Sequence, residues 1–308
     1  MFHNAVTMRQ LAVWLSAALI PTLLQLSAGA GWMAAAITAA VCSCIAYAVT
    51  KWGRYPCGPV FALLQYLYII VLLCNLLPYA AYSWPGDNYP AVPLILLLLA
   101  AWSAHKSAQA AARVSCVLFW LVLGIYLIVL ALGTGEVRVD WLRPAQAAPP
   151  WQGGTLLLIS SGATLAIGKQ QKWNFSMLLP AGFYILGTVV VSGVLSSERA
   201  YELPDPLYTT VRSLMLPGIA QRFEALLSAS MTVGWFSLLT VLLTMSAGAI
   251  EAAKPAWGKK ALWVATACAG AGMLCNLHIS WWILAVLATV FWAIIPLLTQ
   301  GLVRAKKM

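Results

Sequence analysis

The sequence predicts an all-α polytopic membrane protein with ten transmembrane helices, arranged as an inverted five-plus-five repeat. Hydrophobic residues make up 62% of the 308 residues and charged residues only 8%, a composition typical of chains that cross a bilayer many times. Basic residues fall between the apolar runs, as in a topology signal, so the net charge of +10 does not indicate a nucleic-acid partner. Two interrupted apolar runs stand at matching positions in the two halves, which is typical of secondary transporters.

The predicted spans follow one another through a single domain covering residues 1–308. Each is an apolar run that approaches the roughly 20 residues needed to cross a bilayer as a helix. The fourth and sixth are short, and the eighth is long enough to tilt or to extend beyond the bilayer. The ten runs cover approximately residues 10–29, 31–50, 58–83, 90–104, 112–133, 152–168, 174–196, 220–248, 261–277 and 279–300.

The basic residues predict that both ends of the chain face the cytoplasm, because connections rich in Lys and Arg stay on that side. With this orientation 13 of the 18 basic residues fall in inner segments. The first thirty residues are expected to be a retained helix rather than a signal peptide, since more spans follow. The inner residues are Arg9, Lys51, Arg54, Lys106, Arg113, Lys169, Lys172, Lys254, Lys259, Lys260, Arg304, Lys306 and Lys307, and the outer ones are Arg138, Arg143, Arg199, Arg212 and Arg222.

The first and sixth spans are predicted to be broken helices. The first contains Pro21, which removes a backbone donor and clashes with the preceding turn. The sixth has only about 16 residues and carries Ser160, Ser161 and Gly162 at its centre. Open helix ends expose amides that could bind an anionic group and carbonyls that could bind a cation. For either break alone, a proline kink or small residues at a helix contact is the alternative.

The two breaks divide the chain into repeat one, about residues 9–133, and repeat two, about 151–300. Each interrupted run is followed by a tryptophan (Trp32 or Trp173) and then by an intact run. Because five is an odd number, the two halves enter the membrane from opposite sides. Within repeat two, in the outer segment 197–217, the sequence predicts one amphipathic helix on the outer surface, at 206–216, with Leu207 and Val211 on its apolar face.

Polar residues in the middle of spans are the candidate ligand-binding residues, although interhelical hydrogen bonding is the alternative for each one. No carboxylate stands at mid-membrane, which argues against proton-coupled active transport. No nucleophile, metal-ligand spacing or phosphate loop is present, so no enzymatic activity, metal or cofactor is expected. The candidates are Ser16, Pro21, Thr22, Tyr66, Asn75, Ser160, Ser161, Gly162, Thr164, Ser237 and Thr240.

Residues 203–236, LPDPLYTTVRSLMLPGIAQRFEALLSASMTVGWF, resemble a stretch of the B subunits of spore germinant receptors, permease-like proteins of the amino acid–polyamine–organocation superfamily. Weaker similarity covers residues 9–32 and 141–144. The sixth span departs from the family pattern, because Gly162 is followed by Ala163 where the family has a glutamate. The residues that carry the resemblance are Pro206, Tyr208, Arg212, Arg222, Glu224, Ala225, Leu226 and Trp235.

The resemblance implies a subunit of the spore inner membrane that signals germination to two partner subunits. It would bind a small molecule, an amino acid being the expected ligand, between the first, third, sixth and eighth spans. An amino acid transporter of the same fold is one alternative. A scaffold subunit that binds no ligand is the other. A dry space filled with side chains between the two breaks would favour the scaffold, and a polar cavity there would oppose it.

Overall fold

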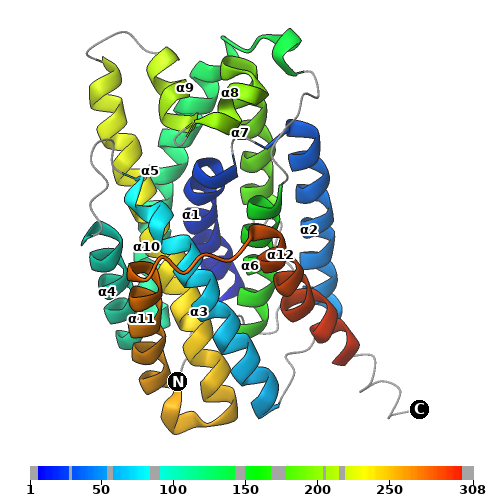
Figure 1. Ribbon diagram of the computed structural model, residues 1–308, viewed down its shortest axis with the longest axis vertical. Helices are drawn as coiled ribbons and strands as arrows, with labels where there is room; N and C mark the ends of the chain where they lie inside the picture. Colours follow the sequence, from blue (N-terminus) through cyan, green and yellow to red (C-terminus); the bar gives the residue numbers. More distant parts are fainter. Residues whose placement is uncertain are drawn as a thin grey trace.

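The computed structural model describes residues 6–27, 30–53, 58–83, 91–142, 150–167, 178–203, 206–214 and 219–299. These segments are helical and contain no β-strand. Figure 1 shows them as an elongated bundle. The elements are α1 (Met8–Ser27), α2 (Trp32–Trp52), α3 (Pro59–Ala81), α4 (Ala91–Lys106), α5 (Ala108–Thr134), η1 (Val139–Leu142), α6 (Trp151–Ala166), α7 (Leu179–Leu195), α8 (Ser197–Glu202), α9 (Pro206–Leu214), α10 (Ile219–Ala253), η3 (Pro255–Trp257), α11 (Gly258–Leu274), α12 (Trp281–Thr289) and the π-helical turn η4 (Val290–Ile294).

The outer surface of the bundle is apolar, as expected for a protein embedded in lipid. Five helices are long and apolar enough to cross a membrane, at Trp32–Trp52, Pro59–Ala81, Ala108–Thr134, Phe223–Ala253 and Trp281–Thr299. Large apolar side chains such as Ile37, Leu98 and Val117 are more than half exposed on the outer helices. Lipid solvates such a surface, whereas a water-soluble monomer rarely exposes so large an apolar area. The chain is therefore an all-α membrane protein, and the number of ten spans stays a prediction.

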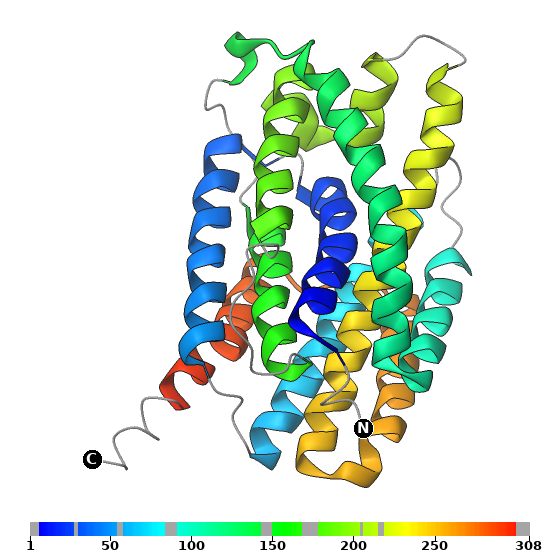
Figure 2. The ribbon, with the colours of Figure 1, turned by 180° about the vertical axis from the view of Figure 1, so that it is seen from behind.

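Helices α1 and α6 lie at the centre of the bundle. Between Leu11 and Gln25 every side chain of α1 except Val13 is buried. It packs against α5, α6, α7 and α10, and Figure 2 shows it in the middle of the bundle in dark blue. In α6, every residue from Gly153 to Thr164 is buried. The two helices with the predicted breaks are thus shielded from lipid by the other helices.

The prediction that these two helices are broken is wrong: α1 runs without interruption through Pro21, and α6 through Ser160, Ser161 and Gly162. The proline is accommodated because its ring lies against Gly234 of α10, which has no side chain to oppose it. In α6 the hydroxyl of Ser160 donates to the backbone carbonyl of Leu157, 2.6 Å away. Hydroxyls that bond to the preceding turn leave the backbone helical, as is common in membrane helices.

The described charges separate between the two ends of the bundle. At one end, where α2, α4 and α10 finish and α3, α5 and α11 begin (the lower end in Figure 1), lie Arg9, Lys51, Lys106, Arg113, Lys254, Lys259 and Lys260, with Glu251 as the described acid. At the opposite end lie Arg138, Arg199 and Arg212 together with Glu136, Asp140, Glu198, Glu202 and Glu224. Every lysine whose side chain is described therefore lies at the same end. Arg54, Arg143, Lys169, Lys172, Trp173, Arg304, Lys306 and Lys307 lie outside the described residues.

Candidate functional site

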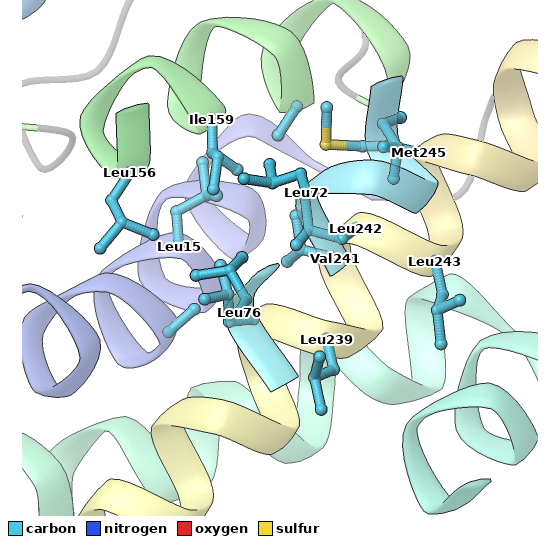
Figure 3. Packing of buried hydrophobic residues seen from close by; sticks show 14 of the residues in the cluster. Leu15, Leu72, Leu76, Leu156, Ile159, Leu239, Val241, Leu242, Leu243 and Met245 are labelled. Carbon is cyan, nitrogen blue, oxygen red and sulfur yellow. The ribbon is translucent and has the colours of Figure 1, made fainter. Parts of the chain in front are cut away.

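The predicted ligand-binding space, among α1, α3, α6 and α10, is filled by apolar side chains. Figure 3 shows leucine, isoleucine and valine side chains from these helices pointing toward one another. None of them is more than 1% exposed. Such close packing leaves no room for an amino acid beside the predicted breaks without movement of the helices. The residues at the centre are Leu15, Leu72, Leu76, Ile159, Val241 and Leu242.

Most of the predicted hydroxyl ligands are satisfied within their own helix. Oγ of Ser16 donates to the Ala12 carbonyl at 2.8 Å, and Oγ1 of Thr22 donates to the Ala18 carbonyl at 2.8 Å. In the same way, Oγ1 of Thr164 bonds the Ser161 carbonyl at 2.7 Å and Oγ1 of Thr240 bonds the Phe236 carbonyl at 2.6 Å. Their partners are backbone carbonyls one turn earlier, so these contacts stabilise the helices and do not by themselves form a site.

Three other predicted residues form contacts between elements. Oγ of Ser237 on α10 lies 3.1 Å from Oγ of Ser115 on α5. Tyr66 donates its hydroxyl to the Ala261 carbonyl of α11 at 2.8 Å. Asn75 accepts a hydrogen bond of 2.8 Å from the amide of Ile279, in the connection between α11 and α12. Through these two hydrogen bonds, Tyr66 and Asn75 join α3 to α11 and its connection rather than to the predicted breaks.

Gly162, which follows Ser161 in α6, lies against the π-helical turn of η4. A Cβ atom at Gly162 would lie 2.7 Å from both Cδ1 and Nε1 of Trp292, and 2.8 Å from Cε of Met245. Oγ of Ser161 and Nε1 of Trp292 are both buried without a hydrogen-bond partner. Trp292 thus fills the space that the absent side chain of Gly162 leaves open. π-turns are rare and recur at functional sites.

A small recess reaches Ser160 from between α2, α6 and α7. It has space for about one water molecule, so it is too small for an amino acid. Its lining is mostly apolar, and Ser160 and Ser43 supply the hydroxyls. The residues around it are Cys42, Ser43, Ala46, Leu157, Ser160, Leu178 and Ala181.

A partly buried polar network that the sequence interpretation missed joins five helices at the C-terminal end of α1. Nε1 of Trp235 on α10 donates to Oε1 of Gln25 on α1 at 2.7 Å, and Nε2 of Gln25 donates to the carbonyl of Tyr79 on α3 at 3.1 Å. Nε1 of Trp281 on α12 lies 3.3 Å from the Tyr79 hydroxyl. Gln152 at the start of α6, with its amide oriented so that Nε2 donates to the Leu26 carbonyl, accepts from the same Trp281 nitrogen at 3.0 Å.

The sequence contains a signal for this network that the analysis of mid-span hydroxyls passed over. Gln25 and Gln152 are amides within or beside apolar runs, and an amide is costly there unless it is hydrogen-bonded. Each of the two belongs to one of the central helices. A glutamine in or beside an apolar run therefore indicates a contact between helices. Here the two glutamines indicate the place where α1 and α6 join the same network.

The residues of the germinant-receptor resemblance fasten α9 to its neighbours. The Tyr208 hydroxyl lies 2.7 Å from both the Ser83 carbonyl and Oγ of Ser228. Arg212 and Glu224 form a two-pronged ion pair, with Nε to Oε1 at 2.6 Å and Nη2 to Oε2 at 3.2 Å. Pro206 opens α9, where its missing N–H costs nothing. The side chain of Arg222 lies outside the described residues.

The predicted amphipathic helix is present at Pro206–Leu214, with Leu207 and Val211 buried beneath it.

Replacing Arg212 with leucine is expected to loosen α9 without unfolding the protein. The guanidinium is 58% exposed, so the pair stabilises the fold by at most about 1 kcal/mol. Hydrogen–deuterium exchange of α9 peptides should become faster, whereas Arg199→Leu on neighbouring α8 should leave it unchanged. Equal exchange in both variants would contradict the role of the ion pair.

The network of Gln25, Tyr79, Gln152, Trp235 and Trp281 offers hydrogen-bond donors and acceptors without a formal charge. It could bind a polar molecule by replacing its internal hydrogen bonds with bonds to that molecule.

Among the residues that the structure describes, no three His, Cys, Asp or Glu side chains are placed to hold a metal ion. No family model matches this chain, and no curated protein matches it by sequence.

Proposed function

We propose that this chain is a permease-like membrane subunit with ten helices in an inverted repeat. The observation that carries the proposal is an exchange of packing partners between its halves. When α1 to α5 are matched in order with α6, α7, α10, α11 and α12, the pair α1–α5 corresponds to α6–α12, and α1–α7 corresponds to α6–α2. Likewise α3–α11 corresponds to α10–α4, and α3–α4 to α10–α11.

Helices that are matched with each other between the two halves are also in contact. They are α1–α6, α2–α7, α3–α10 and α4–α11, the pairs that would lie on a pseudo-two-fold axis. The halves also differ at several pairs: α1 and α5 both pack along α10, whereas the described parts of α6 and α12 lack equally extensive contacts with α3. A repeat whose halves differ at the central helices suits a protein with distinct closed and open states.

The separation of charges supports the proposed orientation. The end of the bundle that carries the described lysines would face the cytoplasm, and the end with α8, α9 and most of the described acids would face outward. Both chain ends would then be cytoplasmic. This places the Gln25 network nearer the outer side, because Gln25 bonds the carbonyl of Tyr79 close to the outer end of α3.

We further propose that the network binds a small molecule, an amino acid being the expected class, in a germinant receptor of the spore inner membrane. The resemblance over residues 203–236 supports this proposal, and two partner subunits would read the resulting change of shape. Because the space among α1, α3, α6 and α10 is closed, the ligand must favour a conformation in which these helices have moved.

A scaffold subunit that binds no ligand is the second candidate. It is favoured by the apolar filling of Leu15, Leu72, Ile159 and Leu242 at the point where the breaks were predicted. In this case α1 and α6 serve only as packing elements. An amino acid transporter of the same fold differs from both candidates because it moves its substrate across the membrane.

Two measurements on the same preparation of purified protein distinguish the three functions. One is uptake of each common amino acid into proteoliposomes, and the other is ligand binding followed by thermal shift. Binding without uptake is expected for the receptor subunit. Uptake above empty vesicles would identify a transporter, and neither response with well-folded protein would identify a scaffold.

Gln152→Leu is expected to abolish the ligand-induced thermal shift, because this amide bridges α6 and α12 in the network. Thr155→Val is the matched control on the same helix, since Oγ1 of Thr155 bonds only to the Trp151 carbonyl in the hydrogen bonds of the described chain. A shift that survives in Gln152→Leu would move the ligand site away from the network.

A further inference from the structure

A surface of lysines and exposed tryptophans lies where α10 turns into α11. Lys254, Lys259 and Lys260 are exposed there on either side of Trp257, whose side chain is half exposed. Nζ of Lys254 lies 4.5 Å from the centre of the Trp257 ring, and Nζ of Lys260 lies 5.9 Å from it. Two ammonium groups are thus held around one indole by cation–π attraction.

The end of α4 extends this surface. Nε1 of Trp263 on α11 donates to Nδ1 of His105 on α4 at 3.3 Å, so the two helices meet there. The next residue, Lys106, places its ammonium 5.0 Å from the ring centre of Trp102, which is 58% exposed. The ammonium groups of Lys106, Lys254 and Lys260 therefore lie beside aromatic rings, and tryptophan is enriched at the membrane–water boundary of membrane proteins.

The charge of the α4–α11 surface is strongly positive. Four lysines, at positions 106, 254, 259 and 260, face the single described acid in this region, Glu251. The Cβ of Glu251 approaches the backbone at Gly258, where a carboxylate is favoured by the start of α11. Four positive charges and one negative charge give the described residues of this surface a net charge of +3.

Apolar side chains continue from this charged surface along the same two helices. Leu98 and Leu99 on α4 and Val264 on α11 are each more than half exposed. A molecule bound here would meet ammonium groups at one end and a hydrocarbon surface beside it. We propose that the α4–α11 surface binds an anionic phospholipid, with the phosphate at the lysines and the acyl chains along α4 and α11.

Among the residues that the structure describes, the opposite end of the bundle lacks this combination. Arg138 also stacks on a tryptophan, at 4.7 Å from the Trp141 ring, but Glu136 and Asp140 stand beside it in the chain. The acids offset its charge and would repel a phosphate. The lipid site is therefore specific to the lysine-rich end, and it does not depend on the proposed receptor function.

Native mass spectrometry of the full chain in detergent, titrated with phosphatidylglycerol or phosphatidylcholine, tests the proposal. Phosphatidylglycerol is expected to bind more tightly. The variant Lys254→Gln/Lys259→Gln/Lys260→Gln should weaken its binding about tenfold or more, since each lysine near a headgroup contributes to the affinity. The matching arginine variant should retain binding, and so should Arg138→Gln/Arg199→Gln. Equal binding of the two lipids, or no loss in the glutamine variant, would overturn the proposal.

Two measurements need no variant of the site. A photoreactive phosphatidylglycerol should label peptides from the end of α4 and the start of α11 in the unmodified protein, and labelling confined to other peptides would overturn the assignment. Soluble glycerol 3-phosphate should fail to displace the lipid. Displacement by it at equal phosphate concentration would show that the surface binds free phosphate instead.

Discussion

Replacing Gly234 with leucine is expected to prevent α1 from packing on α10 and to cause a large loss of stability. A Cβ at Gly234 would lie 2.7 Å from both Cβ and Cγ of Pro21. The proline ring cannot rotate out of the way, because it is part of the backbone of α1. Extra atoms in a packed core cost about 1–3 kcal/mol and sometimes more, and here the obstacle is rigid.

A graded comparison isolates this contact. Gly234→Ala should lower the midpoint of thermal unfolding in detergent, and Gly234→Leu should lower it further or prevent purification of folded protein. Gly124 on α5 is the matched control, since a Cβ built there meets nothing within 4 Å. Gly124→Leu should leave the midpoint near that of the unmodified protein. Similar midpoints for Gly234→Leu and Gly124→Leu would mean that α1 and α10 are not packed as described.

Replacing Trp292 with alanine is the second change with a large expected effect. The indole is fully buried and lies against Gly162 at the centre of the bundle. Truncation of a buried tryptophan costs about 3–5 kcal/mol, because packing is lost and a cavity remains. Unfolding in SDS, followed by circular dichroism, should show the loss. Trp282 on α12, which is 54% exposed, is the control, and its alanine variant should be affected far less.

A double-mutant cycle tests whether Trp292 fills the space beside Gly162. Gly162→Ala alone is expected to destabilise the protein, because its Cβ would lie 2.7 Å from the indole and 2.8 Å from Cε of Met245. In the Trp292→Ala background the same alanine meets only the flexible end of Met245. The two changes should therefore be non-additive, with the double variant more stable than the sum predicts. Strict additivity would show that the two residues do not touch.

The positions of the membrane helices follow from the sequence. The apolar runs predicted at residues 31–50, 58–83 and 112–133 coincide with α2, α3 and α5, which are long and apolar enough to cross a membrane. The spacing of Leu207 and Val211 predicts α9 and its buried face. These features depend on local sequence, because in lipid each segment must satisfy its own backbone hydrogen bonds and does so as a helix.

Whether the predicted breaks form in α1 and α6 depends on residues far away in the sequence. Whether Pro21 interrupts α1 is decided by Gly234, which leaves space for the ring, and the site beside Gly162 is filled by Trp292 of η4. Gln25 binds Trp235, which lies 210 residues away. The sequence by itself determined the class, the helices and the segregation of charge, because these are set by local composition. Only the tertiary structure decided which polar groups meet and which spaces are filled, because a side chain's partners come from whichever helices pack beside it.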